Sequence, residues 1–157
     1  MAIEIERKFL IKDKNWQEQP GLTVTHIRQG YLISDEGRTV RVRWRNGKGY
    51  LTVKGKPETG SIARLEYEYE IPGADAEALL LLCSRPLIEK KRWLLANGTH
   101  TWEIDVFEGE NAGLTVAEIE LGSENEDFDK PEWLGEEVTY DKRYSNAALS
   151  RIPFSQW

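Results

Sequence analysis

Residues 38–46 read Arg-Thr-Val-Arg-Val-Arg-Trp-Arg-Asn, so that three apolar side chains alternate with three arginines. Successive side chains of a β-strand point to opposite faces. The stretch therefore predicts a strand with one apolar face and one face that carries Arg41, Arg43 and Arg45. The Asn46-Gly47 dipeptide that follows is typical of a tight hairpin turn, so the next strand is predicted to return antiparallel beside this one.

The same alternation recurs along most of the chain. Further strands are predicted at 2–11, 23–33, 50–56, 64–71, 87–96, 99–108 and 115–121, with a last short strand at 136–141. Helices are predicted at 13–18, 75–83 and 145–151. About eight strands joined by short connections indicate mostly antiparallel pairing, and that number can close into a barrel. The fold class is therefore mainly β, of α+β type, with a few peripheral helices.

The composition excludes several classes of protein. With 157 residues, 39% of them hydrophobic and 31% charged, the chain fits a single folded domain over 1–157 rather than a disordered segment. No apolar run reaches the roughly 18 residues of a membrane helix, and the acidic start lacks the layout of a signal peptide, so a cytoplasmic protein is expected. One cysteine and two histidines argue against a disulfide framework or a structural zinc site. The net charge of -6 argues against nonspecific nucleic-acid binding.

Charges of one sign are segregated by strand. Acidic pairs spaced by two occur at Glu4/Glu6, Glu66/Glu68, Glu103/Asp105 and Glu118/Glu120, and basic side chains occur at Lys8, Arg41/Arg43, Lys54 and Lys90/Arg92. Spacing by two places both members of a pair on one face of a strand. This face either meets water on a two-faced sheet or, if the sheet closes, lines a polar interior.

A charged interior of this kind would suit one class of ligand. Carboxylate oxygens suit hard divalent cations such as Mg²⁺ or Mn²⁺. Lysine and arginine suit phosphate oxygens. Together they describe a site for a polyphosphate and a metal ion. The sequence offers no Ser/His or Cys/His nucleophile arrangement, so a direct attack by water is expected.

The segment Glu4-Ile5-Glu6-Arg7-Lys8 carries a Glu-x-Glu-x-Lys motif that resembles the CYTH superfamily, the triphosphate tunnel metalloenzymes. The other motifs follow in the family's order: Arg41-Val42-Arg43, Lys54, Glu66-Tyr67-Glu68, Lys90-Lys91-Arg92, Glu103-Ile104-Asp105, Glu118-Ile119-Glu120 and Lys142. The resemblance implies a closed eight-stranded antiparallel β-barrel tunnel. The short bacterial members look most similar, which implies hydrolysis of a triphosphate, often inorganic tripolyphosphate, to pyrophosphate and phosphate.

The resemblance also implies roles for individual residues. The implied metal ligands are Glu4, Glu6, Glu118, Glu120 and Asp105. The implied phosphate-binding residues are Lys8, Arg41, Arg43, Lys54, Lys90 and Arg92. Glu66 and Glu68 would position water, and Lys142 and Tyr31 complete the implied catalytic set. Many relatives carry a basic residue on a helix that plugs the tunnel; this sequence has no obvious equivalent, although Tyr31 is expected near that end.

Other functions stay open on the same fold. A class IV adenylyl cyclase would convert ATP to cyclic AMP, and a thiamine triphosphatase would hydrolyse a substituted triphosphate. A non-catalytic polyphosphate-binding or nucleotide-binding module would bind without turnover. The expected partner is a triphosphate rather than a nucleic acid or a membrane, and the apolar outer faces of the strands suggest a homodimer.

Overall fold

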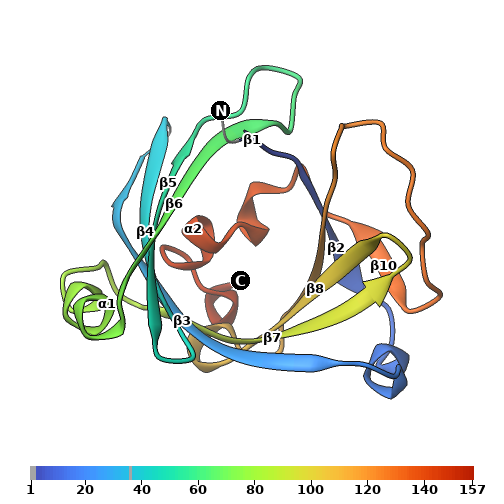
Figure 1. The fold of residues 1–157 in the computed structure, drawn as a ribbon, viewed down its shortest axis with the longest axis horizontal. Helices are drawn as coiled ribbons and strands as arrows, with labels where there is room; N and C mark the ends of the chain where they lie inside the picture. The colour runs from blue at the N-terminus through green and yellow to red at the C-terminus, as the bar shows by residue number, and fades with distance from the viewer. Residues whose placement is uncertain (1–2, 36) are drawn as a thin grey trace.

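The computed structural model describes residues 3–35 and 37–157, which form an antiparallel sheet of ten strands with two short α-helices (Figure 1). The strands are β1 (Ile3–Glu4), β2 (Glu6–Ile11), β3 (Thr23–Ser34), β4 (Arg38–Arg45), β5 (Lys48–Gly55), β6 (Arg64–Pro72), β7 (Ile88–Asn97), β8 (His100–Phe107), β9 (Thr115–Glu120) and β10 (Leu134–Glu137). The α-helices are α1 (Gly73–Leu80) and α2 (Asn146–Leu149). Single 3-10 turns occur at η1 (Asn15–Glu18), η2 (Gly109–Asn111), η3 (Lys142–Tyr144) and η4 (Phe154–Gln156).

The strands hydrogen-bond in the order β1-β6-β5-β4-β3-β7-β8-β9-β2-β10. The sheet thus begins at β1 and ends at β10, so the closed barrel that was expected is not confirmed. Its two sides are nevertheless joined by the chain itself, because only Ile5 separates β1, which pairs with β6, from β2, which pairs with β9. The structure has ten strands rather than about eight, because the segment predicted as one strand at 2–11 is divided at Ile5 and the short strand predicted at 136–141 is present as β10, at Leu134–Glu137.

The helices differ from the predicted ranges at their ends. The predicted helix at 13–18 is only the 3-10 turn η1, which is preceded by a hydrogen bond from the Asn15 N–H to the Asp13 carboxylate. Helix α1 starts at Gly73, two residues earlier than predicted. A Cβ atom at Gly73 would lie 2.1 Å from the carbonyl oxygen of Gly47, so only glycine lets the helix start against the β4–β5 turn. Helix α2 covers only the middle of its predicted range.

The apolar side chains pack mainly on the outer face of the sheet. One cluster, which includes Phe9, Trp102, Ile119 and Trp133, lies against β2, β8 and β9. Another packs α1 against the outer side of β4 and β5, with Val42 and Ala76 fully buried. Burial of apolar surface stabilises these contacts by about 25 cal/mol for each Å² removed from water. Because the core lies outside the strands, their inner faces can stay polar.

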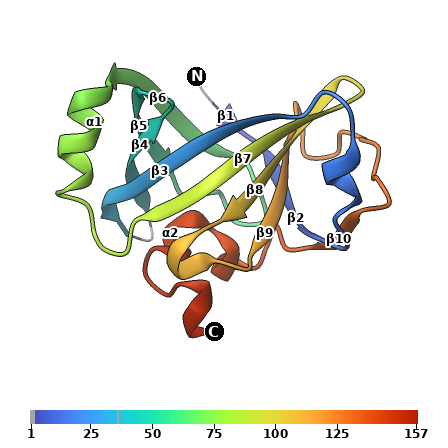
Figure 2. The ribbon, with the colours of Figure 1, turned by 90° about the horizontal axis from the view of Figure 1, so that it is seen from below.

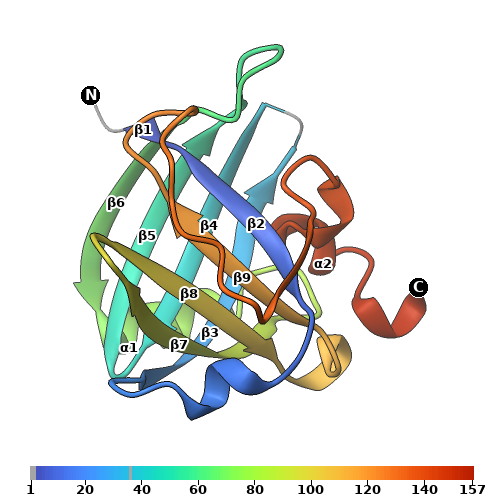
Figure 3. The same cartoon turned by 90° about the vertical axis from the view of Figure 1, so that its right-hand side faces the viewer.

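One end of the interior is nonetheless apolar and blocked. Phe107 and Val116 have the same strand parity as the charged residues of β8 and β9, and both pack against Leu149 of α2. Figures 2 and 3 show α2 and the C-terminal segment against this end of the strands, away from α1. The interior therefore changes along its length from an apolar plugged end to a charged open end.

No helix among residues 3–35 and 37–157 has the length and apolar character needed to cross a bilayer.

Candidate active site

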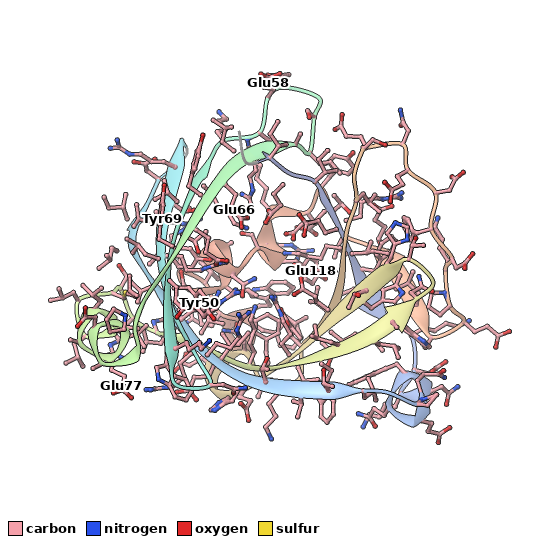
Figure 4. The ribbon with its side chains drawn as sticks, viewed as in Figure 1. Tyr50, Glu58, Glu66, Tyr69, Glu77 and Glu118 are labelled. Atoms are coloured by element: carbon pink, nitrogen blue, oxygen red, sulfur yellow. The ribbon has the colours of Figure 1, made fainter. Side chains whose placement is uncertain are left out.

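The inner faces of the strands enclose a polar cavity of about 250 Å³. It is lined by residues of nine strands and of the segment that begins α2: Glu4, Glu6, Lys8, Tyr31, Thr39, Arg41, Arg43, Arg45, Lys54, Arg64, Glu66, Glu68, Arg92, Glu103, Glu118, Glu120, Ser145, Asn146 and Ala147. Figure 4 shows Glu66 and Glu118 inside the ring of strands, whereas Glu58, Tyr69 and Glu77 lie outside it. The strand alternation thus gathers both signs of charge around one space.

The arginines of β4 form a basic side of the cavity. Arg41 donates a hydrogen bond through Nη2 to Thr52 Oγ1 (3.0 Å), while its buried Nε has no hydrogen-bond acceptor among the described residues. Arg43 Nε donates to Gln29 Oε1 (2.7 Å). Burial, together with the charges of the nearby cations Arg41 and Arg92, lowers the pKa of Arg43 to about 9. Crowded cations and an unpaired donor favour binding of an anion.

Behind this side lies a buried ion network. Asp105 accepts hydrogen bonds from Lys90 Nζ (2.7 Å) and from Arg92 Nε and Nη2 (2.7 and 2.9 Å). Asp105 and Lys90 are fully buried and do not line the cavity. Burial lowers the pKa of Lys90 to about 7, although Asp105 opposes that shift. The network holds Arg92 in place, and Arg92 also donates to Glu103 at 3.0 Å.

The first acidic side joins β1, β5 and β6. Lys54 Nζ donates to both carboxylate oxygens of Glu4 (3.0 and 3.1 Å) and lies 3.4 Å from Glu66 Oε2. Burial raises the pKa of Glu4. Burial also acts to raise the pKa of Glu66, but a hydrogen bond with Glu4 and the charge of Lys54 outweigh it and lower the pKa. Glu66 therefore stays ionised at neutral pH.

The second acidic side joins β2 and β9. Burial, together with the charges of Glu118 and Glu4, raises the pKa of Glu6. Glu118 is buried too, but the charges of Lys8 and Arg92 lower its pKa, and a hydrogen bond with Glu6 adds to the effect. Lys8 Nζ lies 3.5 Å from Glu118 Oε1. Like charges held this close shift the two pKa values apart, so Glu6 takes up a proton more readily than Glu118.

The donor set of the acidic sides fits a hard divalent cation. It offers several carboxylates, and Glu66 Oε2 is buried without a hydrogen-bond donor in the described part of the chain. Within residues 3–35 and 37–157, no three Asp, Glu, His or Cys side chains are already grouped as metal ligands. Instead, the ammonium groups of Lys54 and Lys8 lie beside the carboxylates. A divalent cation would supply the positive charge that these carboxylates otherwise take from the lysines.

Most of the residues predicted for the site line this one cavity, but three do not. Asp105 and Lys90 lie behind the wall, and Lys142 is exposed on η3. Tyr31, from β3, is buried and lines the cavity. Sequence reasoning missed Thr39, Arg64 and the segment 145–147. Arg64 shares the parity of Glu66 and Glu68 and could have been found, whereas nothing in Ser-Asn-Ala marks the segment.

Comparison with known proteins gives concordant matches. Residues 2–152 match the CYTH domain family. The chain is 48% identical to the "Inorganic triphosphatase" of Acetivibrio thermocellus, over 100% of this chain and 99% of that protein. It is 37% identical to the "Inorganic triphosphatase" of Nitrosomonas europaea, over 94% of this chain and 96% of that one. A crystal structure described as an inorganic triphosphatase superposes with a TM-score of 0.68 at 34% identity, covering 96% of this chain and 95% of that one.

Proposed function

This chain belongs to the CYTH domain family, and we propose that it is a metal-dependent inorganic triphosphatase that hydrolyses tripolyphosphate to pyrophosphate and phosphate. The single observation that carries the proposal is the cavity whose basic and acidic sides face one space. A polyphosphate needs cations for its oxygens, and a metal ion needs carboxylates. The names of the two curated relatives support the choice of substrate. Because Ile5 bridges the two sides of the sheet, we also propose that this space is a tunnel.

The cations of the cavity would bind the phosphate chain. Arg41 offers its buried Nε, which has no partner in the described part of the chain, as a donor to a phosphate oxygen. Arg43 and Arg92 are fixed by Gln29 and Asp105, so their positions are set before substrate arrives. Such preorganisation lowers the entropic cost of placing the substrate. Lys8 and Lys54 extend the cationic surface toward the acidic sides.

Glu4, Glu6, Glu118 and Glu120 would hold the metal ion, which we propose to be Mg²⁺ or Mn²⁺. When bound, such an ion neutralises charge on the phosphate oxygens and polarises the phosphorus–oxygen bond. The carboxylates come from both acidic sides, with Glu4 on β1 beside β6, and the other three on the paired strands β2 and β9. Loss of one ligand is therefore expected to weaken the whole site.

Glu66 and Glu68 would position the attacking water. Glu68 Oε1 accepts a hydrogen bond from Thr52 Oγ1 (2.9 Å) and one from Arg41 Nη2 (3.4 Å), so its orientation is fixed. Glu66 stays ionised, and its Oε2 accepts no hydrogen bond from the described residues. An ionised carboxylate oxygen whose only ion pair, among the described residues, is with Lys54 at 3.4 Å can accept a proton from water or orient water by a hydrogen bond. Water then attacks phosphorus directly, without a covalent enzyme intermediate.

The proposal is tested by measuring phosphate release. The purified chain is incubated with tripolyphosphate, ATP or thiamine triphosphate, each with Mg²⁺, Mn²⁺ or EDTA. We expect release of phosphate from tripolyphosphate, abolished by EDTA. Glu4→Gln should lower the rate on the order of 10²–10³-fold, the scale seen for loss of one charge-stabilising group. Glu58→Gln, outside the ring of strands, is the matched control and should retain the activity.

Three results would contradict the proposal. Cyclic AMP formed from ATP would identify a cyclase. Preferred hydrolysis of thiamine triphosphate would identify that compound, rather than tripolyphosphate, as the substrate. Tight binding of tripolyphosphate without turnover, under every metal condition, would leave a binding module in place of an enzyme.

A further inference from the structure

Asn146 enters the cavity from α2, at the plugged end of the interior. Its side-chain oxygen Oδ1 accepts two hydrogen bonds, from Lys90 Nζ (3.0 Å) and from Gln29 Nε2 (3.2 Å). A lysine ammonium group has only donors. The atom of Asn146 that faces Lys90 must therefore be the oxygen, which fixes the orientation of the amide.

The second partner of Asn146 is oriented in the same way. Gln29 Oε1 accepts a hydrogen bond from Arg43 Nε (2.7 Å), and an arginine also has only donors. The other end of the Gln29 amide is then Nε2, which donates to Asn146. These hydrogen bonds run from Arg43 through Gln29 to Asn146, which also accepts one from Lys90. Neither amide group can be turned over without loss of these bonds. Gln29 and Lys90 are fully buried, so water does not compete for these bonds.

The same orientation leaves the Nδ2 amide group of Asn146 as a donor without an assigned acceptor. Nδ2 donates no hydrogen bond to residues 3–35 and 37–157, and it is not among their buried, unpaired atoms. It therefore stays accessible on a residue that lines the cavity. An amide N–H is a good donor to an anionic oxygen.

We propose that Asn146 is a substrate-binding residue whose Nδ2 donates a hydrogen bond to an oxygen of the phosphoryl group at the plugged end. This rests on the proposed function. A neutral donor is appropriate here, because the cations Arg43 and Lys90 are already crowded and burial lowers the pKa of both. A further cation would add repulsion, whereas an amide adds a bond and no charge.

The position of Asn146 also restricts the class of substrate. Beyond it, the interior is filled by Leu149 with Phe107 and Val116. The phosphoryl group bound at this end therefore has no room for a substituent, and any substituent must extend toward the open end. The substrates are thus triphosphates with at least one free terminal phosphate, held with that phosphate at Asn146.

The variant Asn146→Asp distinguishes a loss of substrate binding from a loss of fold stability. The carboxylate keeps an acceptor for Lys90 and Gln29 but replaces the Nδ2 donor with an anionic oxygen. Loss of one hydrogen bond to a charged group corresponds to about 10–100-fold, so we expect KM for tripolyphosphate to rise by at least about 10-fold. The rise in Tm caused by tripolyphosphate, measured in EDTA by thermal shift, should fall in parallel, while the Tm without ligand stays close to that of the parent.

Two further variants complete the experiment. Asn146→Ala removes both acceptor and donor, and should raise KM and also lower the Tm without ligand. Asn15→Asp places a new carboxylate on the exposed 3-10 turn η1, where the Asn15 side chain makes no hydrogen bond to the described residues, and should change neither KM nor Tm. A parent-like KM and thermal shift in both Asn146 variants would overturn this proposal alone. Failure of the parent chain to bind and hydrolyse tripolyphosphate would overturn the proposed function instead.

Discussion

Replacement of Asp105 by asparagine tests the buried network behind the cavity. Asp105 accepts three short hydrogen bonds from two cations, Lys90 and Arg92, and is almost wholly buried. The asparagine is nearly the same size, but it is neutral and directs an NH₂ group toward a donor. Removal of one partner from a buried ion pair costs about 3–5 kcal/mol, because the remaining charge is left uncompensated.

This cost sets the expected shift in unfolding temperature. For a chain of this length each kcal/mol corresponds to about 2–4 °C, so Asp105→Asn should lower Tm by about 10 °C. The assay is thermal unfolding and urea unfolding in EDTA, with Asp127→Asn as an exposed control. If Asp105 is chiefly a metal ligand, as the family resemblance implies, the variant in EDTA will match the parent. In that case only the stabilisation by added Mg²⁺ or Mn²⁺ will be lost, and the reasoning from the network is refuted.

Two further predictions concern regions away from the cavity. Hydrogen bonds from Arg7 lower the pKa of Glu137 below its unfolded value, so this pair stabilises the fold above about pH 4.5 and ceases to do so as pH falls through the folded pKa. Glu137→Gln should therefore cost about 1 kcal/mol at pH 7 and progressively less as pH falls through the folded pKa, and urea unfolding that shows a pH-independent cost would contradict this. A Cβ atom at Gly30 would lie 2.7 Å from Cys83 Cβ, so Gly30→Ala should destabilise the fold by about 1–3 kcal/mol in the same assay. Gly37→Ala, with its nearest contact at 3.8 Å, is the control, and equal stability of the two variants would show that the crowding at Gly30 is relieved at no cost.

The alternation of side chains predicted most strands and most of the site because both depend on local parity. Glu66 and Glu68 face inward for the same reason that Arg41 and Arg43 do. The parity of a residue determines which face of the strand its side chain occupies, but not how far along the interior it lies. Asp105 shares a face with Glu103, yet only Glu103 reaches the cavity. Depth depends on register between strands distant in sequence, which no local pattern records.

Two other features could not be read from local sequence. Residues 3–6 alternate regularly across Ile5, so nothing there predicts that pairing changes from β6 to β9 at this residue. Asn146 follows a typical helix cap, Ser145, and its position in the cavity depends on the packing of Leu149 against β8 and β9. Both features result from contacts between distant parts of the chain.

The long-range pairing of β2 has a consequence for synthesis of the protein. Glu6 pairs with Glu120, so a ribosome that adds about 5–20 residues per second delivers the two on the order of 10 s apart. During that interval β3 to β8 can form their hairpins, since their pairings are closer in sequence and therefore faster. Strand β1, with Glu4, can already pair with β6, but β2, with Glu6, remains unpaired until β9 emerges. The phosphate-binding arginines of β4 are thus ordered before the acidic side formed by β2 and β9, and a nascent chain stalled before β9 would have the basic side of the cavity without Glu118 and Glu120.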